Sequence, residues 1–590
     1  MDVFGKLKES LLSVEKPARY TGGEYNTPDV YKKRKADICI CFPDIYEIGM
    51  SNLGISILYG MLNDNPDFVA ERCFAPWHDM GELLKKKGLP LYSLESKRPL
   101  TEFDAVGFSI QYELLYSNIL YMLDLAGIPF TAKDRGEEYP FIIAGGPCTV
   151  NPEPFRDFFD IIQIGEGEEM LTSLMNLIAE GKEKGFSKEE VLKRAATIEG
   201  VYVPRFHEVG KKVRKAVVKD FENSYYPVKP LVPNIEIVHD RAVLELYRGC
   251  ASGCRFCQAG FYYRAIRERS PEKLLSLAVR SLENSGFDEM SMASLSTGDY
   301  YKLMPLISSV SDYIKDKHVN LALPSLRLSS FEGAFALNTR MNSLTFAPEA
   351  GSQRLRDVIN KNITEDDIFD SVSDAFDRGY DHLKLYFMMG LPTETDEDIL
   401  EICRLVKDIR ELYIKKTGNK RLTVSVSCSV FIPKPVTPFQ WEEQISLEEM
   451  LRRQNLLRNA LRTVKGVAFS WHGAETSVLE AVFARGDEKL GPVISSAYGK
   501  GAKFDGWSEH FRWDVWQEAF SENGLDMRDY VRARDTDQTL PWDFIDTTVR
   551  KEYLLKEREK AYNGITTRSC REGCNGCGAN GSVKCFGGVL

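Results

Sequence analysis

Seven of the thirteen cysteines fall in two short segments, and this clustering limits what the chain can be more than any other feature. One cluster is Cys250, Cys254 and Cys257; the other is Cys570, Cys574, Cys577 and Cys585. Both begin with the spacing Cys-x3-Cys-x2-Cys. The odd total argues against a disulfide framework. Tight cysteine clusters in a cytosolic chain indicate metal binding instead.

Composition and charge place the chain among globular proteins. It has 590 residues, 43% of them hydrophobic and 27% charged, and a net charge of 76 − 86 = −10. This acidic balance disfavours a protein that holds nucleic acid through a global positive field. The longest uncharged apolar stretch, residues 48–63, is shorter than the ~20 residues of a membrane span. The N-terminus shows no apolar signal-peptide core. We therefore expect a cytoplasmic protein with no membrane segment.

The first third of the chain alternates short apolar runs with amphipathic stretches. The expected strands are 36–42, 105–110, 141–144 and 161–164, and the expected helices are 52–62 and a segment that ends at 178. This alternation predicts an open, mostly parallel α/β sheet. Ligands of such sheets bind at the carboxyl ends of the strands. The candidate residues at or just beyond those ends are Asp44, Gly49, Ser109, Gly145 and Gly146.

A second alternating region predicts a complete or partial barrel of six β/α units. Its expected strands are 243–247, 289–293, 319–323, 343–347, 382–389 and 422–432, with helices such as 271–284 and 397–412. Function in such barrels lies at the carboxyl ends of the strands. The first cysteine cluster begins three residues after the first of these strands.

The whole chain is thus expected to be α/β, with a helix-rich end and a cysteine-rich tail. The expected segments are an N-terminal extension (1–35), a Rossmann-like domain (36–200), a linker (201–240), a barrel (241–465), a helical region (466–564) and a tail (565–590). Within the linker, the alternating basic residues and valines of 211–219 suggest a small hairpin.

The first cysteine cluster has two readings from its residues alone. A 4Fe–4S cluster normally takes four cysteines, so three would leave one iron open to another ligand. The alternative is a structural zinc site with a distant fourth ligand, such as His239.

Several motifs, taken together, resemble the radical S-adenosylmethionine (radical SAM) superfamily over residues 240–440. The cysteine motif follows the first barrel strand and has Phe256 before its last cysteine. Residues 296–299 resemble the segment that meets the methionine amino group, and 348–353 resemble the motif that contacts ribose and methionine. Residues 390–395 follow the fifth strand, as in the methylthiotransferase-like branch.

This resemblance implies that three cysteinates hold a 4Fe–4S cluster whose fourth iron binds S-adenosylmethionine. One electron then gives methionine and a 5′-deoxyadenosyl radical. An electron donor such as flavodoxin or ferredoxin would be a partner. The implied cofactor-binding residues are Phe256, Gly298, Asp299, Glu349 and Ser352. For Asp299 and Glu349 the alternative is capping of the following helix.

The N-terminal region resembles the cobalamin-binding domain that is fused to many radical SAM enzymes. Asp44, Gly49, Ser109, Gly145 and Gly146 would then contact the cofactor. Members that ligate cobalt carry Asp-x-His-x-x-Gly, whereas this chain has Tyr46 in the place of the histidine. Either cobalamin binds with no protein nitrogen below the cobalt, or the domain has lost it. With segments 323–328 and 433–441 added, the chain is similar to an uncharacterised bacterial family of such enzymes.

The four tail cysteines could close either a zinc site or an auxiliary iron–sulfur cluster. The six remaining cysteines read as small buried hydrophobes: Cys39, Cys41, Cys73, Cys148, Cys403 and Cys428. A methylthiotransferase needs a second cluster on three N-terminal cysteines, and these do not sit in matching contexts. His472 is the candidate catalytic acid or base, with a structural histidine as the alternative.

The leading hypothesis is a radical SAM enzyme that methylates an unactivated carbon with the help of cobalamin. One alternative is a methylthiotransferase-like enzyme without cobalamin, and another is a non-catalytic metal protein that relays electrons or scaffolds a partner. The substrate stays open among RNA, a peptide and a small molecule. Arg264, Arg267 and Arg269 could meet RNA phosphates or another anion, or form a solvated helix entry.

Overall fold

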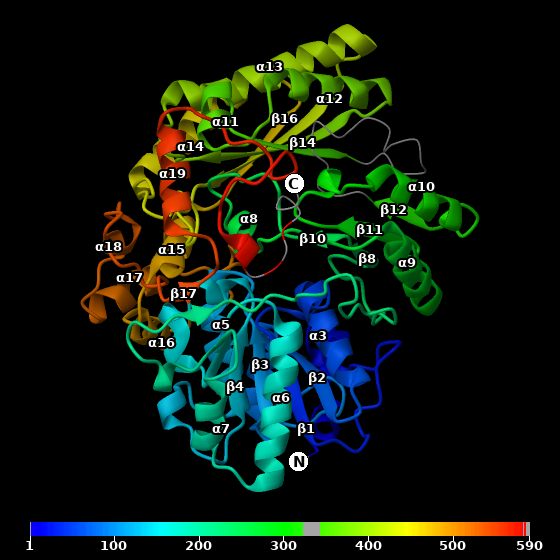
Figure 1. Ribbon diagram of the computed structural model, residues 1–590, viewed down its shortest axis with the longest axis vertical. Helices are drawn as coiled ribbons and strands as arrows, with labels where there is room; N and C mark the ends of the chain where they lie inside the picture. The colour runs from blue at the N-terminus through cyan, green and yellow to red at the C-terminus, as the bar shows by residue number, and fades with distance from the viewer. Residues whose placement is uncertain (1, 323–342, 582, 584, 586–590) are drawn as a thin grey trace.

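The computed structural model describes residues 2–322, 343–581, 583 and 585, and it places the N-terminal domain at one end of an elongated molecule (Figure 1). Two further sheets with their helices occupy the other end, and the C-terminal helices run along one side between the two ends. Within the described part of the chain, no helix has both the length and the apolar character that a membrane crossing requires.

The N-terminal domain is a six-stranded sheet with the order β2-β1-β3-β4-β5-β6, parallel except for the last strand. Its strands are β1 Ala36–Phe42, β2 Phe68–Phe74, β3 Ala105–Ser109, β4 Phe141–Gly145, β5 Ile161–Gln163 and β6 Val201–Tyr202. Helices α3 Leu53–Asp64 and α6 Gly167–Lys184 pack on one face, and α4 His78–Lys87 and α5 Tyr116–Ala126 pack on the other. The alternating pattern therefore forms the expected parallel α/β sheet.

The linker does not form the expected hairpin. Its strand β7 Val213–Arg214 pairs in parallel with β17 Ile545–Asp546 of the C-terminal region. A hairpin would have placed the basic residues of 211–219 opposite one another, which is unfavourable. One of them, Lys215, is instead buried, and its Nζ donates to the carbonyl oxygens of Tyr262 and Arg264.

Two parallel sheets form the barrel region, with the orders β12-β11-β8 and β13-β14-β15-β16. Their strands are β8 Ala242–Glu245, β11 Glu289–Ala293, β12 Asn320–Ala322, β13 Leu344–Glu349, β14 His382–Met389, β15 Thr423–Val430 and β16 Val467–Trp471. Their helices include α9 Pro271–Ser285, α10 Leu303–Ile314, α12 Glu365–Asp377, α13 Asp396–Thr417 and α14 Leu447–Leu461. Segment 323–328 and the end of the strand expected at 319–323 lie outside the described residues.

The barrel region extends further along the chain than the sequence suggests. We expected it to end at residue 465, but β16 pairs in parallel with β15 and so belongs to the same sheet. Helix-rich structure follows, as expected: α15 Ala474–Arg485, α16 Leu490–Gly499, α17 Trp513–Glu522, α18 Met527–Val531 and α19 Lys551–Tyr562.

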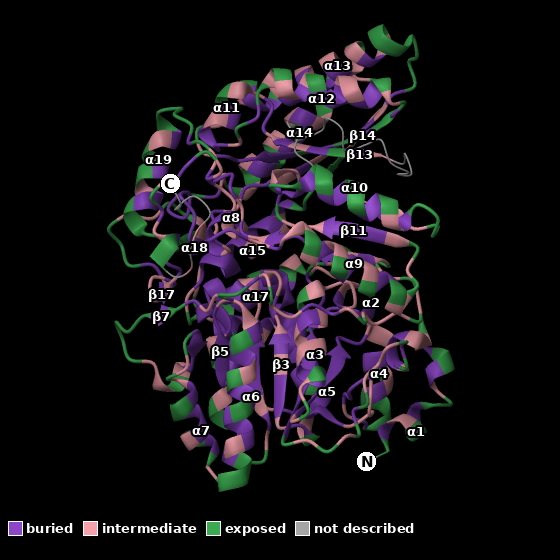
Figure 2. Ribbon diagram, turned by 45° about the vertical axis from the view of Figure 1, so that its right-hand side comes forward, coloured by how far each residue is buried: buried purple, intermediate pink, exposed green. Residues whose placement is uncertain are grey.

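These C-terminal helices share a buried core with both other regions (Figure 2). The rings of Phe483 on α15 and Tyr116 on α5 lie 5.1 Å apart. Buried Asp505 accepts hydrogen bonds from Ser117 of α5 and, at 2.9 Å, from Trp516 of α17. The C-terminal region therefore fastens the N-terminal domain to the barrel.

Candidate functional site

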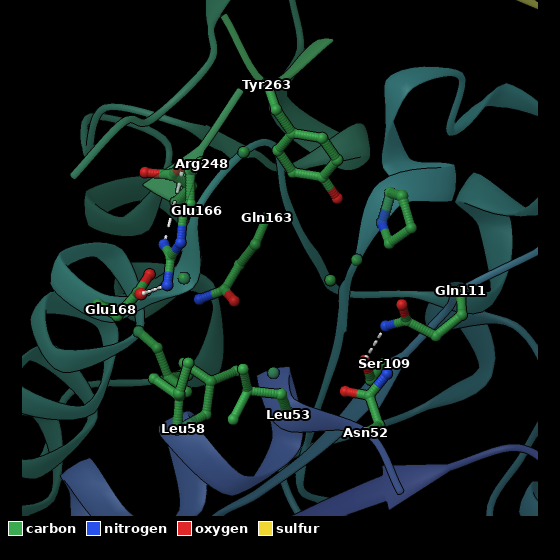
Figure 3. Close-up of a pocket in the computed structure, with 18 of the residues that line it drawn as sticks. Asn52, Leu53, Leu58, Ser109, Gln111, Gln163, Glu166, Glu168, Arg248 and Tyr263 are labelled. Atoms are coloured by element: carbon green, nitrogen blue, oxygen red, sulfur yellow. Dashed lines mark hydrogen bonds and ion pairs between the residues drawn. The ribbon is translucent and has the colours of Figure 1, made fainter. Parts of the chain in front are cut away.

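A cavity of about 460 Å³ lies where the carboxyl ends of the N-terminal strands face the barrel (Figure 3). On one side it is lined by residues of β1, by the ends of β3, β4 and β5 and by the first turns of α3 and α6. On the other side it is lined by residues 247–249 and 293–295 of the barrel and by Tyr263. Because the connection after β1 and the connection after β3 run in opposite directions along the sheet, this is the position at which open α/β sheets bind ligands.

Three of the predicted cofactor-binding residues, Ser109, Gly145 and Gly146, line this cavity. A Cβ added at Gly145 would lie 3.5 Å from the Oε1 of Gln163, in ordinary van der Waals contact. Gly146 has a φ of +107°, and a Cβ there would lie only 2.5 Å from the carbonyl oxygen of Ile110. Gly146 is therefore required by the backbone, whereas Gly145 leaves space inside the cavity.

The structure places Asp44 and Gly49 outside the lining. Asp44 is buried and accepts hydrogen bonds from the Tyr112 hydroxyl at 2.8 Å and the Trp507 indole at 3.1 Å, so it joins the N-terminal domain to the C-terminal region. Burial raises the pKa of its carboxyl group. A Cβ at Gly49 would collide with the ring of Phe74 at 2.2 Å. Both residues therefore shape the loop after β1, and neither touches the cavity.

Gln163, at the end of β5, was not singled out by the sequence reasoning, yet it points into the middle of the cavity (Figure 3). Its side chain is 95% buried, at 5% relative exposure, and its Nε2 has no hydrogen-bond partner within the described chain. An unsatisfied buried amide is costly, so it marks a position where a bound molecule can accept a hydrogen bond. The available signal was a polar residue at the end of an apolar strand.

Ion pairs between the two domains close one side of the cavity. Arg267 donates to both carboxylate oxygens of Glu166, at 2.6 and 2.7 Å. Arg248 lies 2.6 Å from Glu168 and donates to Glu245 at 2.8 Å. Burial alone would raise the pKa of Glu166, but the bonds from Arg267 and the charge of Arg248 lower it overall.

These contacts correct both readings of the basic stretch. Arg264, Arg267 and Arg269 are 2%, 7% and 0% exposed, so they form neither an RNA-binding surface nor a solvated helix entry. Arg269 is paired with Glu245 at 3.3 Å. The carboxylates that neutralise Arg267 and Arg269 come from other segments of the chain, which the local sequence could not reveal.

The first cysteine loop begins at the cavity, since Gly249 lines it and Cys250 is the next residue. Gly249 and Gly253 have φ values of +91° and +73°, which let the loop curl back on itself. Burial raises the pKa of Cys257 to about 12, and the neighbouring thiols of Cys254 and Cys250 act in the same direction. The three sulfur atoms therefore lie near one another.

Single-ion geometry is not found at this loop. No group of three His, Cys, Asp or Glu side chains in the described chain is arranged to hold one metal ion. A 4Fe–4S cluster places each cysteine on a different iron, so its thiolates do not converge on one point. His239, the proposed zinc ligand, is instead 3.0 Å from Arg241 through its Nδ1.

The predicted cosubstrate residues border this loop. Gly298 and Asp299 lie in the turn Thr297–Asp299 after β11. Burial raises the pKa of the Tyr247 hydroxyl, and the nearby carboxylate of Asp299 and thiol of Cys250 raise it further. Glu349 ends β13 with a φ of +67° and pairs with Lys361 at 3.1 Å. The positive charge of Lys361 also lowers the pKa of the Cys257 thiol, against the larger effect of burial.

Ser352 and Phe256 have clear structural contacts. Ser352 is the N-cap of α11 Gln353–Val358, accepts from the Leu355 amide at 3.2 Å and donates to Asp398. Phe256 packs against a small core that includes Ala350 and Leu355. The N-cap of α11 is thus Ser352, and the N-cap of α10 is Lys302. Neither Asp299 nor Glu349 caps the helix that follows it, and both remain candidates for cosubstrate contacts.

Comparison with known families identifies the type of domain that contains this loop. Residues 244–406 match the radical SAM superfamily, and residues 54–204 match the N-terminal domain of radical SAM proteins. The chain is a radical SAM enzyme. The cofactors of this superfamily are a 4Fe–4S cluster and S-adenosylmethionine, and the matched region contains the loop of Cys250, Cys254 and Cys257.

Individual relatives are more distant. The chain is 29% identical to an uncharacterised protein of Methanocaldococcus jannaschii over 464 residues, which cover 78% of this chain and 90% of that one. It is 26% identical to the threonylcarbamoyladenosine tRNA methylthiotransferase of Treponema pallidum over 182 residues, 30% of this chain and 37% of that one. The radical SAM methyltransferase TsrM of Kitasatospora setae, solved with cobalamin and a 4Fe–4S cluster, has a TM-score of 0.44 and 14% identity over 67% of this radical SAM enzyme and 72% of TsrM.

The cysteines outside the two clusters lie in the core of the radical SAM enzyme. Cys39 and Cys41 on β1 and Cys73 on β2 are buried, as are Cys148, Cys403 and Cys428. Burial raises the pKa of Cys148 and Cys428. None of the described cysteines forms a disulfide. The N-terminal cysteines therefore pack as hydrophobes, as expected.

His472 does not reach the cavity of the radical SAM enzyme. It follows β16 with its side chain exposed, and its backbone N–H donates to the carbonyl oxygen of Cys428 at 3.2 Å. The tail lies against the first cysteine loop, where the backbone N–H of Cys570 donates to the carbonyl oxygen of Ala251. Of its cysteines, Cys570 and Cys577 are buried, Cys585 is partly buried and Cys574 is exposed.

Proposed function

We propose that this radical SAM enzyme is a cobalamin-dependent methyltransferase whose cavity between the N-terminal domain and the barrel holds cobalamin. The observation that carries the proposal is the continuity of this cavity with the cysteine loop. One wall is the ligand-binding edge of an open parallel sheet, and the other includes Gly249, the residue before Cys250. A cofactor bound there would lie beside the iron–sulfur site.

The lining fits cobalamin, which combines an apolar corrin ring with peripheral carboxamides. Apolar side chains such as Leu53, Leu58 and Leu171 face the cavity, and Gly145 leaves it open. The unpartnered Nε2 of Gln163 can donate to a carboxamide oxygen. Mostly apolar walls with a few placed polar groups are typical of cofactor sites.

Each part of the chain then has a role. When bound, cobalamin supplies a transferable methyl group, and the 4Fe–4S cluster with S-adenosylmethionine supplies radical chemistry. The loop from Tyr247 to Cys257 orients the two sites toward each other. The buried pairs Arg267–Glu166 and Arg248–Glu168 hold the two domains together and exclude water from the space between them.

The protein offers no imidazole at the place where a cobalt-ligating histidine would stand. Tyr46 occupies it, and its hydroxyl donates to Glu24 at 3.0 Å, within a buried pair between Glu24 and Arg72. Tyr46 is 1% exposed and is not part of the lining. We therefore propose that cobalamin is held by the walls of the cavity, without a nitrogen ligand from the chain.

Cobalamin retention tests this function directly. The protein is reconstituted anaerobically, saturated with hydroxocobalamin and passed through gel filtration, and the retained cobalamin is measured by its absorption. Gly145→Val adds a branched side chain that fits the protein but fills the cavity, so retention should fall at least about 10-fold. Gly499→Ala, at a position with no atom within 4 Å of the added Cβ, is the matched control.

Wild type and Gly499→Ala should retain about one cobalamin per chain. If wild type retains none after saturation, the methyltransferase proposal fails. If Gly145→Val retains as much as wild type, cobalamin binds elsewhere and the assignment of the cavity is wrong.

A further inference from the structure

The cysteine-rich tail is docked directly on the radical SAM cysteine loop. The backbone N–H of Cys570 donates to the carbonyl oxygen of Ala251 at 2.9 Å. Asn360 bridges the two segments, since its Nδ2 donates to the carbonyl oxygen of Gly253 at 3.1 Å and its Oδ1 accepts from the amide of Thr567 at 2.7 Å. The second cysteine motif thus lies against the first.

A bidentate ion pair fixes the same contact from the other side. Arg571 donates to both carboxylate oxygens of Glu268, at 2.8 and 2.5 Å. Glu268 belongs to β10 Arg267–Glu268, which pairs with β9 Tyr247–Arg248 just before the first cysteine loop. The tail is therefore held both by the loop itself and by the strand pair that precedes it.

Arg264 is buried between the two cysteine motifs. It is 2% exposed, and its Nη2 would lie 3.3 Å from a Cβ added at Gly253. It donates to the Gly260 carbonyl at 3.1 Å and the Tyr553 hydroxyl at 3.3 Å, and no Asp or Glu among the described residues forms an ion pair with it. The nearby thiols of Cys577 and Cys570 are among the groups that raise the pKa of its guanidinium.

A buried guanidinium needs a negative partner, because an uncompensated charge in the interior is very unfavourable. A cluster bound by cysteinates carries net negative charge and would provide it. Arg264 therefore places a permanent positive charge beside the tail, where a negatively charged cluster would balance it.

The tail itself is arranged around sulfur. Cys570 lies within electrostatic range of Cys577 and Cys585. Two N–H groups point at sulfur atoms: the Nδ2 of Asn575 lies 3.6 Å from the Sγ of Cys570, and the amide of Gly576 lies 3.4 Å from the Sγ of Cys574. Such bonds to sulfur tune the clusters that cysteinates hold.

We propose that Cys570, Cys574, Cys577 and Cys585 hold a second 4Fe–4S cluster that passes electrons to the cluster of the first loop. This site does not depend on cobalamin. The tail repeats the Cys-x3-Cys-x2-Cys spacing of the first loop. Cys574 is exposed and Cys570 touches the first loop, so the tail spans from solvent to the radical SAM site.

The electron step balances simply. A reduced one-electron carrier protein of the flavodoxin or ferredoxin class gives one electron to the tail cluster, which changes from the 2+ to the 1+ state. The tail cluster returns to 2+ as the loop cluster is reduced from 2+ to 1+. The carrier loses one electron, the loop cluster gains one, and no proton is transferred.

Metal analysis of the full chain tests the site. Anaerobically reconstituted wild type should hold about eight irons, and the Cys250→Ala/Cys254→Ala/Cys257→Ala protein about four. Cys574→Ala/Cys577→Ala should lose about four irons and keep an electron paramagnetic resonance (EPR) signal that S-adenosylmethionine perturbs. The signal left in the loop variant should be insensitive to S-adenosylmethionine. Cys403→Ala, a buried cysteine on α13, is the matched control and should keep all the iron.

The single variant Cys574→Ala separates a change at the metal site from misfolding, because its side chain is exposed and leaves the core intact. Three cysteines remain, as in the first loop, so the second EPR signal should change in form while thermal unfolding changes little. A wild-type protein with one zinc and about four irons would overturn the proposal, as would a Cys574→Ala/Cys577→Ala protein with undiminished iron.

The electron route has its own measurement. In Cys574→Ala, reduction of the loop cluster by a reduced flavodoxin should slow at least about 10-fold, while reduction by dithionite, a small molecule that reaches the loop without the tail, should stay near the wild-type rate. Equal slowing with both reductants, or no slowing with flavodoxin, would contradict the relay.

Discussion

Arg267 and Glu166 form a buried bidentate ion pair that joins the barrel to the N-terminal domain beside the cavity. Removing one partner leaves the other as an uncompensated buried charge. We predict that Glu166→Ala lowers the free energy of unfolding by about 3 kcal/mol. Glu169→Ala, exposed in the first turn of α6, the helix that Glu166 caps, should change it by less than about 0.5 kcal/mol.

Urea unfolding of the two variants without cofactors checks this prediction. Equal stability of Glu166→Ala and Glu169→Ala would show that the two domains are held together by other contacts.

Asp505 should make stability depend on pH. Burial raises its pKa from 3.8 to about 6, although Ser117 and Trp516 donate hydrogen bonds to it. Because the folded pKa lies above the unfolded one, the native state is favoured below pH 3.8, and this contribution is lost as the pH rises to about 6.

Asp505→Asn removes this titration and keeps an acceptor for Trp516. Its stability relative to wild type should therefore increase by up to about 3 kcal/mol between pH 4 and pH 7. Urea midpoints across this range provide the measurement. A difference between the two proteins that does not change with pH would rule out the titration of Asp505.

Gln163 should contribute to cofactor affinity through its unpartnered amide. Gln163→Leu removes the donor at nearly constant volume, so the Kd for hydroxocobalamin should rise about 5- to 10-fold, the loss expected for one hydrogen bond. The free protein should become no less stable, because a buried unsatisfied group is removed. Gln517→Leu, at an exposed position on α17, is the control.

Titration monitored by absorption measures both affinities, and thermal unfolding measures both stabilities. An unchanged Kd for Gln163→Leu would mean that the amide does not meet the cofactor.

Tyr46 should be dispensable for cobalamin binding. Its hydroxyl donates a hydrogen bond to Glu24, and neither residue lines the cavity. Tyr46→Phe should therefore retain cobalamin fully and lose only about 1 kcal/mol of stability. The EPR spectrum of bound cob(II)alamin should show no coupling to a protein nitrogen. A strong nitrogen coupling whose splitting changes in protein grown with ¹⁵N-labelled histidine would reveal an imidazole ligand and contradict the proposal.

Much of the N-terminal sheet could be predicted, and the exception is instructive. The apolar run of β1 gave its bounds, but β2 contains Glu71 and Arg72, which interrupt the pattern of a buried strand. Arg72 is 0% exposed, and Glu24 and Glu95 neutralise it at 2.9 and 2.7 Å. A strand buried through long-range ion pairs has no local signature.

The same limit applies to the functional site. The two cysteine motifs were visible because metal ligands cluster in the sequence, and Gly145 because it follows a strand. Arg264 was read as surface charge, since Tyr553 lies 289 residues further along the chain and the tail cysteines lie beyond it. Likewise β16 was missed because its apolar run, residues 467–469, is short and none of its residues is buried.

The most direct test of the account follows the methyl group. Protein loaded with iron, sulfide and cobalamin is incubated anaerobically with reductant, S-adenosylmethionine bearing a trideuteromethyl group, and an extract of cells that lack this protein. We predict that a deuterated methyl group appears in a component of the extract, that omitting cobalamin abolishes it, and that Cys254→Ala abolishes it too. Transfer of the label without cobalamin, or no transfer by protein that holds both cofactors, would contradict the account.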